Sequence, residues 1–137
     1  MRVFLDANVL FSAAKSDGAI RELLRLLLHA GHVLCADEYV VEESRRNLLR
    51  KGREAVAMLE EQLAAIEVAR CRRYALPRSV MERIDAKDRP VLAAAAGMAC
   101  DVLLTGDRTH FGALYGEVLA GVRIESPRLL AERLKLV

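Results

Sequence analysis

The order of apolar segments along the chain is the feature that most constrains its fold. Short apolar runs alternate with longer segments in which apolar residues recur at helical spacing. Most of the short runs are continuously apolar, which is typical of strands buried on both faces of a parallel sheet. The sequence therefore predicts an α/β fold, with a mostly parallel sheet covered by helices. The expected strands are residues 3–5, 32–36, 67–71, 101–105 and 122–125, and the expected helices are residues 19–30, 38–51, 53–66, 79–84, 91–99 and 127–134.

Length and composition indicate one globular domain spanning residues 1–137. A chain of 137 residues is close to the commonest domain size, and the sequence contains no linker, repeat or low-complexity tract. Its hydrophobic fraction of 53% and net charge of +2 exclude an intrinsically disordered chain. The same net charge is too even to indicate a nucleic-acid-binding protein by itself, so that case depends on where the charges lie.

The cysteines and the N-terminus favour a cytoplasmic protein. Cys35, Cys71 and Cys100 lie among apolar neighbours without CxxC spacing, which predicts reduced, buried thiols. The histidines show no zinc-ligand spacing with these cysteines. The N-terminal apolar run is interrupted by Asp6 and no cleavage signal follows it. The longest uncharged apolar stretch is about half of the roughly 20 residues that span a bilayer, so we expect no membrane contact.

Four carboxylates fall where a parallel sheet gathers functional groups, beyond the carboxyl ends of its strands. Asp6 ends the first expected strand, and Asp107 follows the fourth. Asp88 precedes the helix that leads into that fourth strand, and Glu43 lies on the helix after the second strand. Clustered carboxylates repel one another unless a cation neutralises them, and oxygen ligands suit Mg²⁺ or Mn²⁺ better than zinc. Hydrolysis of a phosphodiester bond is the chemistry that such a site fits best.

Each acid also has an ordinary structural interpretation. Asp88 could cap a helix, Asp107 could belong to a turn after Gly106, and Glu43 could be a solvated charge on a helix surface. Asp6 is the hardest to explain in this way, because it interrupts an apolar run where strand and core are expected. Residue spacing alone leaves both interpretations open.

Three segments carry a resemblance to a known family. They are FLDANVLFSA around Asp6, ADEYVVEESRRNL around Glu43, and DAKDRPVLAAAAGMACDVLLTGD, which contains Asp88 and Asp107. Together they resemble the PIN-domain family, and specifically the single-domain toxins of VapBC-type toxin–antitoxin pairs. Each motif is weak alone, but their order and spacing are specific, and the resemblance extends from Arg2 to the ESPRLLAERL segment near the C-terminus.

The resemblance implies both a fold and an activity. It implies a five-stranded, mostly parallel sheet in the order 3-2-1-4-5, and an endoribonuclease that depends on Mg²⁺ or Mn²⁺. The toxin subgroup further implies an RNA substrate, a small antitoxin protein that blocks the site, and usually a homodimer.

The resemblance also assigns the catalytic metal ligands, which would be Asp6, Glu43, Asp88 and Asp107. Family spacing favours Glu43 over its neighbour Glu42, and Asp88 over Asp85. Ser44 departs from the family pattern, because an apolar residue usually follows the glutamate.

Further residues have possible supporting roles. Asn8 and Thr105 could orient metal-bound water or a carboxylate, although a turn residue and a strand end would look the same. Arg46 and Arg50 share one face of the helix expected at residues 38–51 and could contact RNA phosphates, or simply be solvated. Aromatic residues make up only 4% of the chain, so recognition is expected to depend on backbone charge and shape.

Three other functions are alternatives to the nuclease. A haloacid-dehalogenase-type phosphatase would need a second aspartate where this chain has Asn8. A phospho-receiver domain would need a lysine after the last strand, where this chain has Glu125, Ser126 and Pro127. A catalytically silent PIN-like scaffold that only binds a partner would differ by lacking activity.

Overall fold

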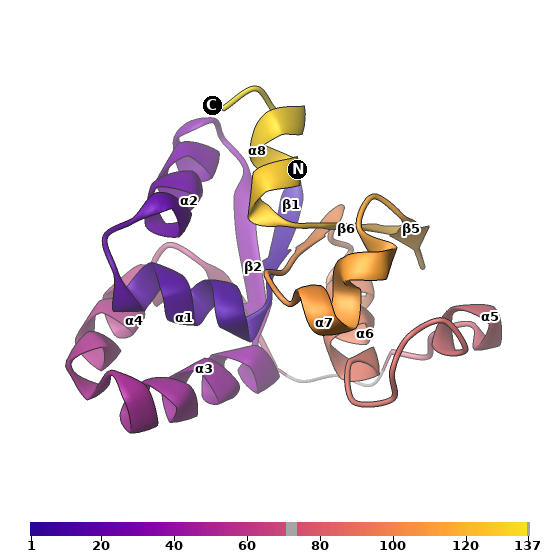
Figure 1. Cartoon of the computed structure of the whole chain (residues 1–137), viewed down its shortest axis with the longest axis horizontal. Coiled ribbons are helices and arrows are strands. Elements are labelled where there is room, and N and C mark those ends of the chain that lie inside the picture. The colour runs from indigo at the N-terminus through magenta and orange to yellow at the C-terminus, as the bar shows by residue number, and fades with distance from the viewer. Residues whose placement is uncertain (71–73, 137) are drawn as a thin grey trace.

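The central feature of the fold is a mixed β-sheet with helices on both faces (Figure 1). The computed structural model describes residues 1–70 and 74–136, and within these the sheet has six strands in the order β3-β2-β1-β4-β6-β5. All neighbouring strands are parallel except β5 and β6, which form an antiparallel hairpin. The strands are β1 (Arg2–Leu5), β2 (Val33–Asp37), β3 (Glu67–Ala69), β4 (Val102–Leu104), β5 (Val118–Leu119) and β6 (Val122–Glu125).

The helices lie in two groups around this sheet. Helices α1 to α4 gather on one side of β1 and β2, whereas α6 packs against β2, β4 and β6 (Figure 1). The α-helices are α1 (Ala7–Lys15), α2 (Ala19–His29), α3 (Glu38–Lys51), α4 (Val56–Leu63), α5 (Arg78–Met81), α6 (Arg89–Gly97), α7 (Arg108–Phe111) and α8 (Pro127–Arg133). Short 3₁₀ turns at Arg53–Ala55 and Gly112–Leu114 precede α4 and follow α7.

Strands β1 and β4 form the centre of the core. Val3, Phe4 and Leu5 of β1 have no exposed surface, and the three residues of β4 are at most 1% exposed. β1 pairs with β2 on one edge and with β4 on the other, with Val3 opposite both Leu34 and Val102. This double burial explains why both strands are continuously apolar, and it fixes their carboxyl ends side by side.

The α/β prediction is confirmed, and so is the predicted order of the five parallel strands, with β6 as the fifth. The sheet differs from the prediction by one further strand, β5. Its two residues are too few to show a period in the sequence. They pair with β6 across a tight turn at Ala120 and Gly121, both of which have positive φ, as a two-residue hairpin of this kind requires.

Two helices were absent from the sequence prediction. Helix α1 begins directly after Asp6, whose carboxylate accepts the Ala7 backbone N–H at 2.8 Å, so the residue that ends β1 also caps the next helix. The turn at Asp107 likewise opens α7. The predicted strand at residues 67–71 is shorter, since β3 ends at Ala69, and Cys71 lies outside the described residues.

The remaining general expectations concern thiols and membranes. Cys35 and Cys100 are buried free thiols, as predicted, whereas Cys71 is not described. In the part of the chain that the structure describes, every helix is too short or too polar to cross a bilayer.

One ion pair with a buried carboxylate attaches the last helix to the sheet. Glu125 ends β6 and is only 3% exposed. Arg133 on α8 donates from Nε to both carboxylate oxygens at 3.0 Å, and from Nη2 to Oε1 at 2.5 Å. The arginine thereby neutralises a carboxylate that would otherwise be buried without a partner.

We therefore expect Arg133→Ala to lower the free energy of unfolding by about 2 kcal/mol, because it leaves the buried Glu125 carboxylate without its hydrogen-bond donors. Chemical denaturation measures this loss. Arg128→Ala is the matched control on the same helix, because Arg128 pairs with Glu132 in solvent and such pairs contribute little. Equal effects of the two substitutions would show that the Glu125–Arg133 pair does not anchor α8.

Candidate active site

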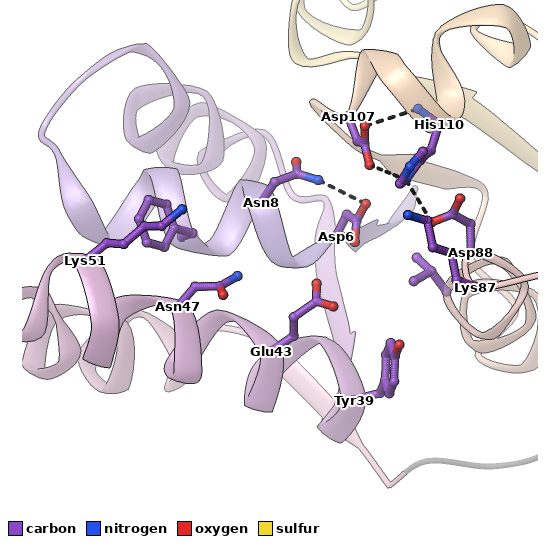
Figure 2. A pocket seen from close by; sticks show the side chains of 12 residues that line it. Asp6, Asn8, Tyr39, Glu43, Asn47, Lys51, Lys87, Asp88, Asp107 and His110 are labelled. Carbon is purple, nitrogen blue, oxygen red and sulfur yellow. Dashed lines mark hydrogen bonds and ion pairs between the residues drawn. The ribbon is translucent and has the colours of Figure 1, made fainter. Parts of the chain in front are cut away.

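A polar cavity lies beyond the carboxyl ends of β1 and β4 (Figure 2). Its volume is about 480 Å³. All four acids singled out from the sequence line it, and they come from four separate segments of the chain. The lining residues are Asp6, Asn8, Phe11, Tyr39, Glu43, Asn47, Lys51, Lys87, Asp88, Val91, Asp107 and His110.

Asp6 is the most firmly held of the four acids. It is 5% exposed, and its Oδ2 accepts hydrogen bonds from Thr105 Oγ1 at 2.8 Å and Asn8 Nδ2 at 3.1 Å. Together with the bond from the Ala7 N–H to Oδ1, these contacts fix the carboxylate at the end of β1. Burial nevertheless raises the pKa of Asp6, while the three hydrogen bonds act in the opposite direction.

Asn8 and Thr105 connect Asp6 to the loop that carries Asp107. Asn8 Oδ1 accepts the Gly106 N–H at 2.7 Å, and Thr105 Oγ1 accepts the Asp107 N–H at 3.2 Å. A Cβ at Gly106 would lie 3.3 Å from Asn8 Oδ1, so a larger residue would press on this contact. The structure therefore places both predicted supporting residues against a carboxylate, where they orient it.

Asp88, Asp107 and His110 form the tightest group in the cavity. His110 Nδ1 lies 2.9 Å from Asp107 Oδ2 and 3.4 Å from Asp88 Oδ1. One ligand atom of each residue lies within 4.8 Å of the other two, close enough to share a metal ion. Asp6 and Glu43 line the same cavity outside this close group. The histidine was missed from the sequence, although its position three residues after Asp107, on the same helical turn, was a usable signal.

The Asp88 carboxylate is incompletely satisfied. Its Oδ2 is buried and has no hydrogen-bond partner among the described residues. Burial raises the pKa of Asp88, and so does the charge of Asp107, while His110 lowers it. A buried carboxylate oxygen without a donor is costly, and a cation bound in the cavity would remove that cost.

The structure separates Glu43 from its rival Glu42. Glu43 lines the cavity, where burial and then the charge of Asp6 raise its pKa. Glu42 points away and pairs with Arg45, which also pairs with Glu60 at 2.7 Å. Neighbouring helix residues diverge by about 100°, so only one of the two glutamates can face the site.

The structure likewise separates Asp88 from Asp85. Asp85 is exposed and does not line the cavity. Its Oδ1 accepts the Lys87 backbone N–H at 3.3 Å, which is an ordinary turn contact.

Helix α3 presents a stripe of four polar side chains to the cavity, spaced four residues apart (Figure 2). The α3 stripe consists of Tyr39, Glu43, Asn47 and Lys51. Only Glu43 was predicted from the sequence, although the constant spacing could have found the others, since residues at i and i+4 share a face. Arg46 and Arg50 lie on a neighbouring, exposed face of α3 and are outside the cavity lining.

Lys87 is the second cationic group that lines the cavity, and it too was missed from the sequence. It lies beside Asp88, on the far side of the acids from Lys51 (Figure 2). The cavity thus has carboxylates at its centre and a lysine on each side. Such a site can bind a divalent cation in the middle and a polyanion along its length.

Solved structures with the same fold include two from toxin–antitoxin systems. VapBC2 from Rickettsia felis, crystallised with a DNA fragment from its promoter, matches with a TM-score of 0.63 and 14% identity, over 92% of this chain and 98% of that one. Mycobacterium tuberculosis VapC20, described as a sarcin–ricin loop cleaving toxin, matches with a TM-score of 0.57 and 14% identity, over 85% of this chain and 98% of that one. No curated protein sequence matches significantly.

The sequence itself matches the model of a protein family, described as PIN domain, over residues 2–109. The match includes all four acids of the cavity, the α3 stripe and the Asp88–Asp107 segment. It covers most of the chain, and the sheet order agrees with the fold expected of this family. The chain belongs to the PIN-domain family.

Proposed function

We propose that this protein is a metal-dependent endoribonuclease and the toxin of a toxin–antitoxin pair. The observation that carries the proposal is the convergence of Asp6, Glu43, Asp88 and Asp107 on one cavity, where burial raises the pKa of three of them. The Oδ2 of Asp88, which has no hydrogen-bond partner among the residues that the structure describes, is a second sign that the site is built for a cation. The predominance of carboxylate oxygens favours Mg²⁺ or Mn²⁺.

Each titratable group at the centre and the two sides of the acids then has a defined task. Asp88 and Asp107, with His110 beside them, would hold the ion, and Asp6 and Glu43 would complete the negative lining that neutralises it. The bound ion would supply positive charge to the phosphodiester and favour deprotonation of the attacking water. Asn8 and Thr105 keep Asp6 in place, so that the carboxylate does not reorganise during the reaction. Lys51 and Lys87 bind substrate phosphates on the two sides of the acids.

The substrate and partners are proposed from the neighbours and the family resemblance. RNA is favoured because VapC20 is described as cleaving the sarcin–ricin loop, and a small antitoxin is favoured because VapBC2 belongs to a toxin–antitoxin system. We infer that the chain acts in the cytoplasm and forms a homodimer, as the toxin subgroup does. Membership of the PIN family leaves the phosphatase alternative without support. The silent-scaffold alternative is decided by a cleavage assay.

The raised pKa values predict a particular pH dependence of stability in EDTA. A carboxyl group whose pKa is higher in the folded state than in the unfolded state lowers the stability of the protein as it ionises. This loss develops as pH rises from the ordinary pKa of 3.8 through the raised pKa of the folded state. Asp88→Asn removes that loss. The stability of the variant relative to wild type should therefore increase with pH above about 4, as followed by thermal unfolding between pH 4 and pH 8.

Added Mg²⁺ or Mn²⁺ should instead make the wild type more stable than Asp88→Asn. The ion binds only the folded wild type and raises its Tm, and Asp88→Asn should lose most of that rise. Asp85→Asn is the matched control, because Asp85 is an exposed aspartate in the same loop. A metal response of equal size in wild type and Asp88→Asn would contradict the proposed metal site.

Cleavage tests the function directly. Purified protein, freed of any antitoxin, should cut total cellular RNA internally with Mg²⁺ or Mn²⁺ and stop in EDTA. Glu43→Gln, Asp88→Asn and Asp107→Asn should each reduce the rate by about a hundredfold or more, the size of loss typical for groups that stabilise transition-state charge. Gel analysis of 5′-labelled RNA measures both the rate and the positions of the cuts.

Glu42→Gln and Asp85→Asn are the controls, and both should cut at the wild-type rate. Cleavage that continues in EDTA, or that survives Asp107→Asn, would falsify the metal-dependent mechanism. Absence of cleavage by the wild-type protein, on total RNA and on a sarcin–ricin stem–loop alike, would favour the silent scaffold.

The cationic groups predict a salt-dependent RNA affinity. Each lost phosphate contact on a single strand lowers the slope of log Kd against log salt by about 0.7. We expect Lys51→Ala to lower the slope, and the double substitution of Arg46 and Arg50 with alanine to lower it further. Arg25→Ala on α2 is the control, since Arg25 pairs with Glu22 outside the cavity. A slope that the Arg46 and Arg50 substitutions leave unchanged would make these arginines ordinary solvated residues.

A further inference from the structure

A second cavity adjoins the acidic one and differs from it in character. Its volume is about 510 Å³, and apolar side chains such as Leu76, Met81 and Pro90 dominate its lining. We propose that this groove, here called the tyrosine groove, binds a nucleobase of the RNA next to the phosphate that is cut. The proposal rests on the nuclease function proposed above and extends it to substrate recognition.

Continuity with the acidic cavity is the first argument. Tyr39 lines both cavities, so its side chain forms part of the wall that they share. Figure 2 shows Tyr39 beside Glu43 on α3, with its hydroxyl end directed toward the side of the pocket where Asp88 and Lys87 lie. A nucleotide whose phosphate lies at the acids therefore has the tyrosine groove as the adjacent space for its base.

The distribution of aromatic residues is the second argument. The chain has three tyrosines, three phenylalanines and no tryptophan. Phe4 and Phe111 are buried in the core, whereas Tyr39 and Tyr74 are 38% and 44% exposed. Both of these exposed tyrosines line the tyrosine groove. Exposed aromatic rings beside a phosphate-binding site are the usual platform on which proteins stack the bases of single strands.

The walls of the groove are held in place by specific contacts. Arg89 donates from Nη2 to the Met81 carbonyl at 2.8 Å, and from Nε to the Met81 and Ile84 carbonyls at 3.1 and 3.2 Å. These bonds attach the end of α5 and the turn after it to the start of α6. Tyr74 lies over Gly97 of α6, where an added Cβ would come within 3.4 Å of the tyrosine Cβ. The groove is therefore formed before any ligand arrives.

The chemistry of the groove suits a planar base better than a phosphate. Its charged lining residues are Asp37 and Arg89, and both make internal contacts, since Asp37 caps α3 by accepting the Val40 N–H at 3.2 Å. Few polar groups remain to read the edge of a base, so stacking dominates over sequence selection. Phosphates are left to Lys51 and Lys87 in the neighbouring cavity.

Tyrosine fluorescence gives a direct binding assay, because the chain has no tryptophan. The probes are the four nucleoside 5′-monophosphates, with ribose 5-phosphate as the base-free control, all in Mg²⁺. We expect all four nucleotides to quench the emission and ribose 5-phosphate to leave it unchanged. The double variant Tyr39→Phe and Tyr74→Phe keeps only Tyr115 as a fluorophore, so it corrects for light absorbed by the nucleotides and should lose the quenching. Equal quenching by ribose 5-phosphate, or no quenching above that correction, overturns the proposal.

Cleavage kinetics separate this inference from the proposed function. Tyr39→Ala and Tyr74→Ala should each raise KM for RNA about tenfold, in the range expected for one lost base stack, while Tyr39→Phe keeps the wild-type KM. The Tm rise with Mg²⁺ should persist in Tyr39→Ala, which shows that the ion site is intact. Val118→Ala removes an apolar side chain that is 54% exposed on the edge hairpin. As the control, it should change neither KM nor the Tm rise with Mg²⁺.

Two further outcomes distinguish the failures. Normal cleavage with unchanged KM in both alanine variants overturns the base site and leaves the nuclease in place. A groove that binds a protein segment instead of a base would give this same result. Nucleotide-specific quenching by a wild-type protein that cuts no RNA overturns the nuclease and leaves the base site in place.

Discussion

The site depends on the central position of β1, which pairs with β2 and β4 along its two edges and is buried on both faces. Because β1 is apolar on both faces, it can occupy only the centre of the sheet, and its carboxyl end then lies next to that of β4. Asp6 is placed there by the end of the strand, and Thr105 reaches it from the neighbouring strand end at 2.8 Å. The same carboxylate caps α1, so strand, helix and site share one residue. Changing Asp6 would therefore disturb local structure as well as chemistry. Asp88 is a cleaner position to substitute, because its side chain makes no cap hydrogen bond to α6.

The cavity concentrates negative charge that the polypeptide alone does not neutralise. Asp6 is held by hydrogen bonds from uncharged groups, and Asp88 keeps one buried oxygen without a partner in the described structure. A buried carboxylate such as Glu125 shows the alternative, since Arg133 satisfies it completely and α8 is attached to the sheet as a result. The contrast separates a carboxylate used for structure from carboxylates left available for a ligand.

Much of this arrangement could be predicted from the sequence, because its signals are local. The apolar runs indicated the strands and a mostly parallel sheet, and the positions of Asp6 and Asp107 after strands indicated a shared edge. The order of the strands came from the family resemblance. Choosing Glu43 over Glu42 and Asp88 over Asp85 needed the family resemblance, since both members of each pair have similar surroundings in the sequence. In the structure the two members of each pair point in different directions, around the axis of α3 for the glutamates and along the loop before α6 for the aspartates. A sequence shows such directions only when the residues that form the helix or the turn are already known.

Other parts could not be read because they depend on contacts between distant residues. Helix α1 was missed since Asp6 was assigned only to the strand that it ends, although one carboxylate both ends that strand and caps the helix. His110 contacts Asp88, which lies more than twenty residues earlier in the sequence. The two residues come together because α6 packs against the sheet. Tyr39 and Tyr74 likewise lie far apart in the sequence, and only the fold brings both to the lining of one groove beside α6.

Helix α3 joins these elements into one surface. The α3 stripe runs from Tyr39 through Glu43 and Asn47 to Lys51, a rise of about 18 Å over twelve residues. Along this line the chemistry changes from aromatic to acidic, then to amide and cationic. Each strand of a base-stacked double helix advances about 3.4 Å per nucleotide, so the stripe is as long as several stacked nucleotides. One helix thus carries both the tyrosine proposed to stack a base and the lysine proposed to bind a phosphate, on either side of Glu43.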